Sequence, residues 1–265
     1  MNYEDLLLEK KEGIATITLN VPAKLNAITP ALERNLPLAI DEVARDDEVK
    51  VVILTGAGRA FCAGGDIEGQ KALFEGTWEQ SRYEKFRLFG QGAADGFARL
   101  NKPVIAAING AAAGAGFSMA MACDIRIASE TARFGSLFIN VALVPDWGLT
   151  YFLPRAVGTS KALELMFTGE LISAAEAERL GIVSRVVPPD QLMNVSRELA
   201  ARIAQQPPIA IALTKKLVYQ DIIGDIAQHL DWETYAQKWC LQTEDHRESV
   251  LAFLEKRPRP QFKGK

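Results

Sequence analysis

The hydrophobic positions in the first half of the chain follow patterns typical of strands. Apolar and polar side chains alternate in IATITL (14–19), directly after a turn at Glu12–Gly13, which predicts a hairpin. Continuous apolar runs, typical of strands covered on both faces, follow. These runs are VKVVILTG (49–56), KPVIAAING (102–110) and CDIRIAS (123–129). We therefore expect a buried sheet.

Helical spacing of apolar residues lies between these strands. Residues 29–47 show it, with Thr29 as a plausible N-cap and Pro30 at the first helical position. Pro37 predicts a kink or an early break in this helix. A further, fairly polar helix is expected within residues 70–100.

From residue 148 onward the pattern is mostly helical, apart from a short strand in IVSRVV (182–187). Four amphipathic helices are expected at the end of the chain, over residues 189–206, 207–222, 223–239 and 243–258. Strands that alternate with helices, followed by helices alone, predict an α/β core over residues 1–190 and a helical C-terminal region over residues 191–265.

Composition narrows the functional classes. The 265 residues carry a formal net charge of −3, which gives no basic footprint for nucleic acid or an anionic membrane. Cys62, Cys123 and Cys240 form no CxxC motif, so a disulfide framework is not expected and a reducing compartment fits. The N-terminal residues show no secretory signal, and we expect a cytoplasmic protein.

Residues 104–123 contain no charge over twenty positions, which is long enough to cross a membrane. Asn109 and the glycines at positions 110, 114 and 116 interrupt this stretch. A buried strand, a glycine-rich turn and a short buried helix explain it better than a membrane span, so no membrane partner is expected.

Several common catalytic motifs are missing. GAGRAF (56–61) begins like a dinucleotide-binding loop but has Phe61 at the third glycine position, and neither GxxxxGK nor GxSxG occurs. His229 and His246 show no ligand-like spacing. A histidine-based triad or a metal site is therefore not expected.

Two glycine-rich loops follow buried strands. They are CAGGD (62–66), at the end of the longer loop AGRAFCAGGD (57–66), and GAAAGAG (110–116). Small residues let another group approach the backbone closely, and N–H groups at a helix start carry partial positive charge. Two such loops could aim two N–H groups at one developing oxyanion. For either loop alone, the favoured interpretation is that the glycines serve only tight turns and close helix packing.

Six motifs occur in order along the chain: AFCAGGDI (60–67), KPVIAAINGAAAGAGFSMAMACDIRIAS (102–129), RFG (133–135), LPRAVG (153–158), TGELISAAEAERLGIVSRVV (168–187) and FLEKRP (253–258). Together they resemble the crotonase, or enoyl-CoA hydratase/isomerase, superfamily. The resemblance implies an α/β fold, a crotonase-like spiral of ββα units with a helical C-terminal region. It also implies acyl-CoA substrates, no permanently bound cofactor beyond the coenzyme A of the substrate, and a homo-oligomer, either a trimer or a dimer of trimers.

The same resemblance assigns residues to the site. The oxyanion hole falls on the N–H groups of Gly65 and Ala115. The implied coenzyme A contacts within the chain are Lys24, Leu25, Ala27, Ala63, Asp66 and Ile67. Phe253 and Lys256 of the last helix are implied to reach the coenzyme A of a neighbouring subunit.

Two departures from the family pattern change the expected reaction. Relatives that hydrate a double bond carry two glutamates, and these positions fall on Ser118 and Phe138 here. Neither side chain can act as a general acid or base at neutral pH. Asp146 falls where some isomerases, notably those of phenylacetate degradation, carry their catalytic aspartate. Phe138 and Trp147 would exclude water and stack near an unsaturated acyl group.

Asp146 lies in an otherwise nearly apolar stretch, NVALVPDWGLT (140–150), and has two interpretations. It could be the N-cap of the helix that starts near Gly148. It could instead be a base whose basicity rises because its charge is desolvated. The sequence favours a thioester isomerase. A hydratase with unusual acid–base groups and a non-catalytic acyl-CoA binder are alternatives, and a dehalogenase-like hydrolase would need a histidine near the first glycine loop.

Overall fold

The computed structural model describes residues 3–67 and 93–264, without the side chains of residues 220–225. Within these residues, a six-stranded sheet has the order β1-β2-β3-β5-β7-β10 and a four-stranded sheet the order β4-β6-β8-β9. The strands are β1 (Leu6–Lys11), β2 (Ile14–Leu19), β3 (Val51–Gly56), β4 (Ala60–Cys62), β5 (Val104–Ile108), β6 (Ala111–Ala113), β7 (Ile125–Ser129), β8 (Arg133–Gly135), β9 (Ile172–Ser173) and β10 (Arg185–Val187).

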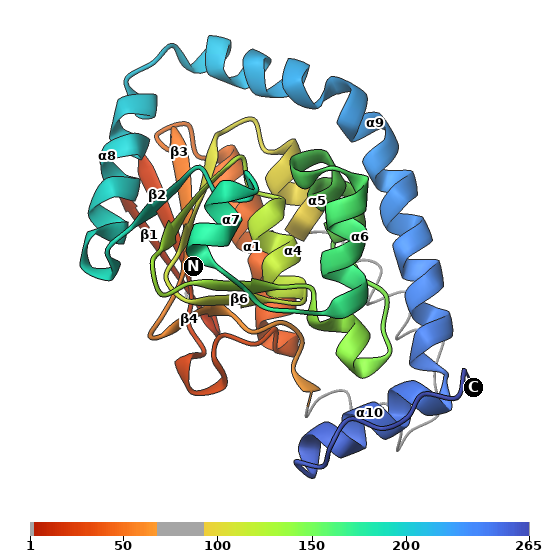
Figure 1. Ribbon diagram of the computed structural model, residues 1–265. Coiled ribbons are helices and arrows are strands. Elements are labelled where there is room, and N and C mark those ends of the chain that lie inside the picture. The colour runs from red at the N-terminus through yellow and green to blue at the C-terminus, as the bar shows by residue number, and fades with distance from the viewer. Residues whose placement is uncertain (1–2, 68–92, 265) are drawn as a thin grey trace.

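Helices surround the two sheets (Figure 1). They are α1 (Pro30–Arg45), α4 (Ala115–Met121), α5 (Leu149–Val157), α6 (Thr159–Thr168), α7 (Ala174–Arg179), α8 (Leu192–Ala204), α9 (Pro208–Leu241) and α10 (Glu244–Leu254), with short 3-10 helices η1 (Pro22–Lys24), η2 (Leu137–Val141) and η3 (Pro189–Gln191). In the described part of the chain, no helix combines the length and the apolar character that crossing a membrane requires.

The larger sheet begins with the expected hairpin. β1 and β2 are antiparallel, and Glu12 (φ 52°) and Gly13 (φ 77°) form the two-residue turn between them. Both central residues of such a turn need positive φ, which the glycine adopts without strain. β2, β3, β5, β7 and β10 then run parallel, and every residue of β3 is buried, as its continuous apolar run predicts.

The strands after the hairpin form a spiral of repeated pairs. In the pairs β3–β4, β5–β6 and β7–β8, the first strand joins the larger sheet and the second joins the smaller one. Successive strands pair in parallel within each sheet. This arrangement confirms the expected α/β spiral. The glycine-rich loops therefore leave neighbouring parallel strands at the same edge of the smaller sheet.

Two of these strands were expected to be loops, and that expectation is wrong. β4 and β6 have three residues each, which is too short to show a period along the sequence. They form because distant segments pair in parallel, with Ala60 opposite Ala111, Cys62 opposite Ala112 and a shift of register between these two pairs.

The helices also differ from expectation in two places. α1 begins at Pro30, with the Thr29 hydroxyl accepting from the Leu32 N–H, but it runs through Pro37 without ending there. The helix expected within residues 70–100 lies mostly outside the described residues, although residues 93–99 are helical.

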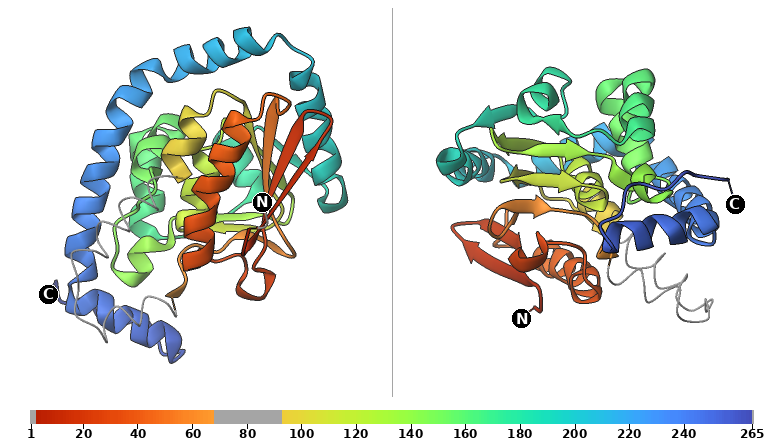
Figure 2. Two further views of the ribbon diagram at one scale, coloured as in Figure 1. Left: turned by 180° about the vertical axis from the view of Figure 1, so that it is seen from behind. Right: turned by 60° about the horizontal axis from the view of Figure 1, so that its bottom comes forward.

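The second and third of the four expected C-terminal helices are one 34-residue helix, α9. It leaves the region of α8, sweeps along one side of the molecule and leads to α10 at the bottom (Figures 1 and 2). α8 lies within the C-terminal region (191–265) that the sequence predicts to be separate from the α/β core. Its Leu192 and Ala200 nevertheless pack in one buried cluster with Val51 and Ile105 of the larger sheet.

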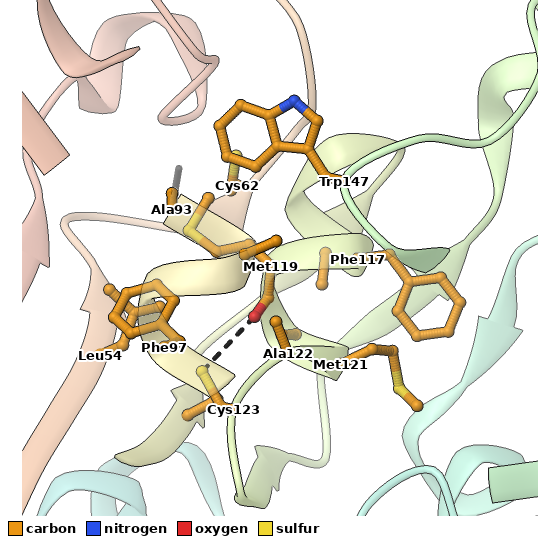
Figure 3. Packing of buried hydrophobic residues seen from close by; sticks show 14 of the residues in the cluster. Leu54, Cys62, Ala93, Phe97, Phe117, Met119, Met121, Ala122, Cys123 and Trp147 are labelled. Carbon is orange, nitrogen blue, oxygen red and sulfur yellow. Dashed lines mark hydrogen bonds between the residues drawn. The ribbon is translucent and has the colours of Figure 1, made fainter. Parts of the chain in front are cut away.

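The main hydrophobic core lies on the other face of the larger sheet and extends toward the smaller sheet. Figure 3 shows part of it, with Met119 near Cys62, Phe97 beside Leu54, Phe117 on the opposite side of the view, and Trp147 at the edge of the cluster. The Cys123 thiol bonds to the Met119 carbonyl oxygen at 3.4 Å, so this thiol is held inside the core.

Candidate active site

A cavity of about 930 Å³ lies where the glycine-rich loops meet the C-terminal helices. Its walls are largely apolar, and they combine residues far apart in the sequence. The expected site residues that line it are Ala63, Gly65, Asp66, Ile67, Ala115, Phe138, Asp146, Trp147 and Phe253. The structure therefore brings most of the expected site residues to one place.

The two glycine-rich loops pack backbone against backbone. A Cβ atom on Gly64, whose φ is +100°, would lie 2.9 Å from the Ala113 carbonyl oxygen and 3.6 Å from the Ala115 nitrogen. A Cβ atom on Gly116 would lie 2.2 Å from the Cys62 carbonyl oxygen. Larger side chains would force the loops apart, so these glycines hold the segments that carry Gly65 and Ala115 close together.

Gly65 and Ala115 both line the cavity. Gly65 is exposed, and its segment is fixed by a bridge with Ile28. Ala115 is the first residue of α4. A backbone N–H at this position has no acceptor within its own helix. The structure thus brings both expected oxyanion-hole residues to one cavity, and the use of their N–H groups as donors stays a prediction.

Asp146 lies on the cavity wall between η2 and α5 and is only 6% exposed. Its Oδ2 atom accepts a hydrogen bond from Gln237 Nε2 at 2.9 Å. Its Oδ1 atom is buried and has no hydrogen-bond partner among the described residues. Burying a carboxyl oxygen without a hydrogen-bond partner costs folding free energy, so a purely structural role does not explain this aspartate.

The surroundings of Asp146 favour its protonated form. Burial is the largest cause, and the charges of Glu233 and Glu33 add to it, while the hydrogen bond from Gln237 opposes them. Together they raise the pKa of Asp146 to about 8. Both protonation states are therefore populated near neutral pH.

The alternative role of Asp146 as a helix N-cap is not what the structure shows. Gly148 occupies the N-cap position of α5. The carboxylate at this helix start is Glu233 of α9, which accepts from the N–H of the N-cap Gly148 at 2.8 Å and from the Thr150 N–H at 3.1 Å. The Leu149 N–H donates to the backbone carbonyl of Asp146 at 3.1 Å, not to its side chain. The Asp146 side chain is therefore left to face the cavity.

The backbone next to Asp146 turns sharply. Trp147 has a φ of 53°, a conformation that bulky residues rarely adopt, and Gly148 follows with a φ of 80°. Strain of this kind persists where the surrounding structure over-determines it, and functional sites are common places for it. The turn places Asp146 and Trp147 on the same cavity wall.

Three polar residues of the site were missed from the sequence. Glu33 of α1 and Gln237 of α9 line the cavity, and Glu233 of α9 caps α5. Burial raises the pKa of Glu33 and of Glu233 to about 7 each. Glu33 could have been noticed, because it falls at helical spacing with the buried Leu36 and Ile40.

The segment implied to contact coenzyme A lies against the first glycine loop. The Ala63 N–H donates to the Leu25 carbonyl at 3.0 Å, and Lys24 Nζ lies 2.9 Å from Asp66 Oδ2. Lys24, Leu25 and the buried Ala27 are not among the residues that line the cavity. Their contacts with coenzyme A stay predictions.

Three further residues complete the expected set, and the contacts of Phe253 and Lys256 with a neighbouring subunit's coenzyme A stay predictions. Ser118 is fully buried in α4, and its hydroxyl donates to the Gly114 carbonyl at 3.3 Å, so it does not line the cavity. Phe253, implied to reach a neighbouring subunit, lines the cavity of its own chain because α10 packs beside η2. Lys256 lies one turn beyond it and outside the lining.

Arg257 and Arg259 also line the cavity. Neither was predicted from the sequence as a site residue. Arg257 Nη1 lies 2.8 Å from Glu248 Oε1, and Arg259 Nη2 donates to the Ile139 carbonyl at 2.9 Å. Guanidinium groups are well suited to binding phosphate oxygens.

Comparison with known proteins gives one consistent family. The profile of the family described as enoyl-CoA hydratase/isomerase matches residues 9–265. A short-chain-enoyl-CoA hydratase from Clostridium acetobutylicum is 40% identical over 268 residues, which cover 100% of each chain. A 1,2-epoxyphenylacetyl-CoA isomerase from Escherichia coli is 36% identical over 262 residues, which cover 99% of each chain.

Comparison with solved structures points to the same family. The crystal structure of an enoyl-CoA hydratase from Mycobacterium avium subsp. paratuberculosis K-10 is similar, with a TM-score of 0.88 and 31% identity over 99% of this chain and 100% of that chain. The names of these relatives include hydratases and an isomerase, so the specific reaction has to be argued from the site.

Proposed function

The chain belongs to the enoyl-CoA hydratase/isomerase family, and on this premise we propose that it shifts the double bond of an enoyl-CoA thioester, with Asp146 as the residue that moves the proton. The observation that carries the proposal is the Asp146 carboxyl. It is buried in a cavity wall, with one oxygen bound by Gln237 and the other unpartnered.

The glycine-rich loops supply the electrophilic part of the mechanism. The N–H groups of Gly65 and Ala115 bind the thioester carbonyl oxygen and stabilise the negative charge that collects there when a proton leaves C2. Losing one such donor typically costs about 2.7–4 kcal/mol of transition-state stabilisation.

Asp146 supplies the proton-transfer part. Its carboxylate takes a proton from C2 of a 3-enoyl thioester, the C–H electron pair moves into the dienolate, and a proton is delivered to C4. A raised pKa suits this role, because a group that titrates near the operating pH both accepts and releases protons efficiently.

The walls of the cavity favour isomerisation over hydration. Ser118 and Phe138 stand where hydratases of the family carry glutamates, and Ser118 does not reach the cavity. Phe138 and Trp147 give apolar surface beside Asp146, which disfavours an attacking water. Arg259 offers positive charge to the phosphates of coenzyme A, whereas Arg257 is paired with Glu248 and Glu255.

The test compares wild type with Asp146→Asn on 3-enoyl-CoA and on 2-enoyl-CoA, following conjugation and water addition separately. Wild type is expected to conjugate the 3-enoyl thioester. The variant keeps the side-chain size but loses the basicity, so isomerisation is expected to fall by a factor on the order of 10² or more. Binding of coenzyme A thioester should persist.

A matched control is Asp190→Asn, which removes an exposed carboxyl in η3 far from the site in sequence. It should isomerise at the wild-type rate. A folded Asp146→Asn variant that isomerises as fast as wild type would remove Asp146 from the mechanism.

Hydration of a 2-enoyl-CoA is the second candidate function. Two observations favour it: the 40% identity to a short-chain-enoyl-CoA hydratase, and a second carboxyl, Glu33, on the cavity wall. Water addition by wild type at a rate above that of conjugation would make hydration the main reaction.

A further inference from the structure

Glu33 lies on the cavity wall, and the chain fixes its position with respect to the first glycine loop. The Ile28 N–H donates to the Gly64 carbonyl at 2.8 Å, directly before α1. The Thr29 hydroxyl then caps the Leu32 N–H at 3.0 Å, and the Glu33 N–H donates to the Thr29 carbonyl at 2.9 Å. Glu33 is thus one capped helical turn from the oxyanion loop.

Glu33 and Asp146 reach the same cavity from different elements. Glu33 comes from α1, and Asp146 comes from the turn before α5. No hydrogen bond or ion pair engages the Glu33 carboxyl among the described residues, although the neighbouring Arg34 weakly favours its charged form. Among the described residues, the Glu33 carboxyl and the Oδ1 atom of Asp146 thus have no hydrogen-bond partner, and both residues line the cavity.

The protonation of the two groups is linked. Burial raises the pKa of Glu33 to about 7, and the charge of Glu33 contributes to raising the pKa of Asp146 to about 8. Glu233, which caps α5, adds its own charge at Asp146, and Gln237 donates to it. Like charges close together resist joint ionisation, so Glu33 and Asp146 together hold about one proton between pH 7 and 8. The higher pKa of Asp146 places this proton on Asp146 in the more populated form. The reactive form, with the proton on Glu33 and Asp146 ionised, is the minor form in exchange with it.

We propose that Glu33 is a second catalytic acid–base residue of this cavity, serving one reacting carbon of the acyl group while Asp146 serves the other. The inference rests on the proposed function of the site. A single carboxyl would have to reach both C2 and C4, whereas two carboxyls on different elements remove that geometric demand.

The steps balance without any further reactant. The Asp146 carboxylate takes the C2 proton, and the C–H electron pair moves into a dienolate whose charge rests on the thioester oxygen. The Glu33 carboxyl gives its proton to C4, and the double bond ends between C2 and C3. Asp146 is then protonated and Glu33 ionised, which is the more populated form of the free site, and proton exchange with solvent regenerates the reactive form.

The experiment uses Glu33→Gln, Asp146→Asn and wild type with 3-enoyl-CoA in deuterated water. It measures conjugation and, separately, deuterium entering C2 of the unconverted substrate. Glu33→Gln is expected to lose conjugation by a factor on the order of 10² while retaining C2 exchange, because Asp146 still removes that proton. Asp146→Asn is expected to lose both.

Two further variants make the result specific. Glu33→Asp keeps the acid on a shorter side chain and should recover part of the conjugation lost in Glu33→Gln. Asp41→Asn removes an exposed carboxyl that pairs with Arg45 on the same helix, and it should match wild type in both measurements.

Each other outcome is decisive. Conjugation by Glu33→Gln within a few-fold of wild type shows that Asp146 works alone and overturns the proposal. Loss of C2 exchange together with conjugation shows that Glu33 acts only through Asp146 and also overturns it.

If wild type hydrates 2-enoyl-CoA but conjugates nothing, the isomerase assignment fails by itself. Glu33 is then tested on hydration, where a loss on the order of 10² supports it and an unchanged rate overturns it. A wild-type chain inactive in both assays overturns both proposals.

Discussion

The carboxyl group of Asp146 couples the chemistry of the site to the stability of the fold. An aspartate in an unfolded chain has a pKa of about 3.9, whereas burial raises the pKa of Asp146 to about 8 in the folded protein. Between these values the folded state keeps a proton that the unfolded state releases. The free energy of unfolding therefore falls as the pH rises from about 4 to about 8.

Asp146→Asn should remove this contribution. The stability of the variant relative to wild type is expected to increase between pH 5 and pH 8, by on the order of 1–3 kcal/mol, because the amide has no charge to desolvate. Urea denaturation of both proteins at several pH values measures the difference. Parallel stability curves for the two proteins would contradict a buried, titrating Asp146, and Asp190→Asn should give such parallel curves.

Some site residues could be predicted from the sequence and others could not. Asp146 was found because a carboxylate stands out in a nearly apolar stretch. Glu233 and Gln237 were not found, because polar residues are expected on the outer face of an amphipathic helix. Only the packing of α9 against the turn before α5 shows that both are buried.

At the scale of elements, long periodic segments were predicted better than short or merged ones. The buried strands β3, β5 and β7 follow from their apolar runs, whereas β4 and β6 depend on pairing between distant segments. α9 was expected as two helices. Gly224 lies within it and disfavours helix by about 1 kcal/mol relative to alanine, but neither a proline nor a cap ends the helix there.

The first half of α9 is tied to the core by Lys215. Its Nζ atom donates to the carbonyl oxygens of Phe97 (2.9 Å) and Lys102 (3.1 Å) and lies 2.8 Å from Asp124 Oδ2. Both members of the ion pair are largely buried. Removing one partner of a buried pair leaves the other charge uncompensated.

Lys215→Met is therefore expected to lower the free energy of unfolding by about 3–5 kcal/mol. Chemical denaturation measures the loss, and hydrogen exchange should show it first in the N-terminal half of α9. Lys216→Met changes the adjacent, exposed lysine and should stay within about 0.5 kcal/mol of wild type. Equal stabilities of the two variants would show that Lys215 does not anchor the helix.

At the scale of the whole molecule, the site is assembled where three parts of the chain meet. The spiral brings the two glycine-rich loops to one edge, the turn before α5 adds Asp146, and α9 and α10 close the cavity. The long helix therefore has two functions in this chain. Its Gln237 and Glu233 fix the surroundings of Asp146, while its outer surface carries exposed apolar side chains.

That outer surface argues for self-association. Leu217 and Val218 are 68% and 65% exposed, and Trp232, Tyr235 and Trp239 form two edge-to-face ring contacts on the surface of α9. Burying one such apolar side chain contributes roughly 1.5–3 kcal/mol, so covering several of them favours an oligomer strongly.

We expect a trimer or a dimer of trimers at micromolar concentration, measured by sedimentation velocity. Leu217→Asp places a charge on the apolar part of α9 and should shift the protein toward a 29.0 kDa monomer, because an unpaired charge is costly in an apolar interface. Lys11→Asp changes an exposed charge on the β1–β2 hairpin and should leave the assembly intact. A wild-type protein that sediments as a monomer would contradict the prediction, and the apolar side chains of α9 would then need another explanation.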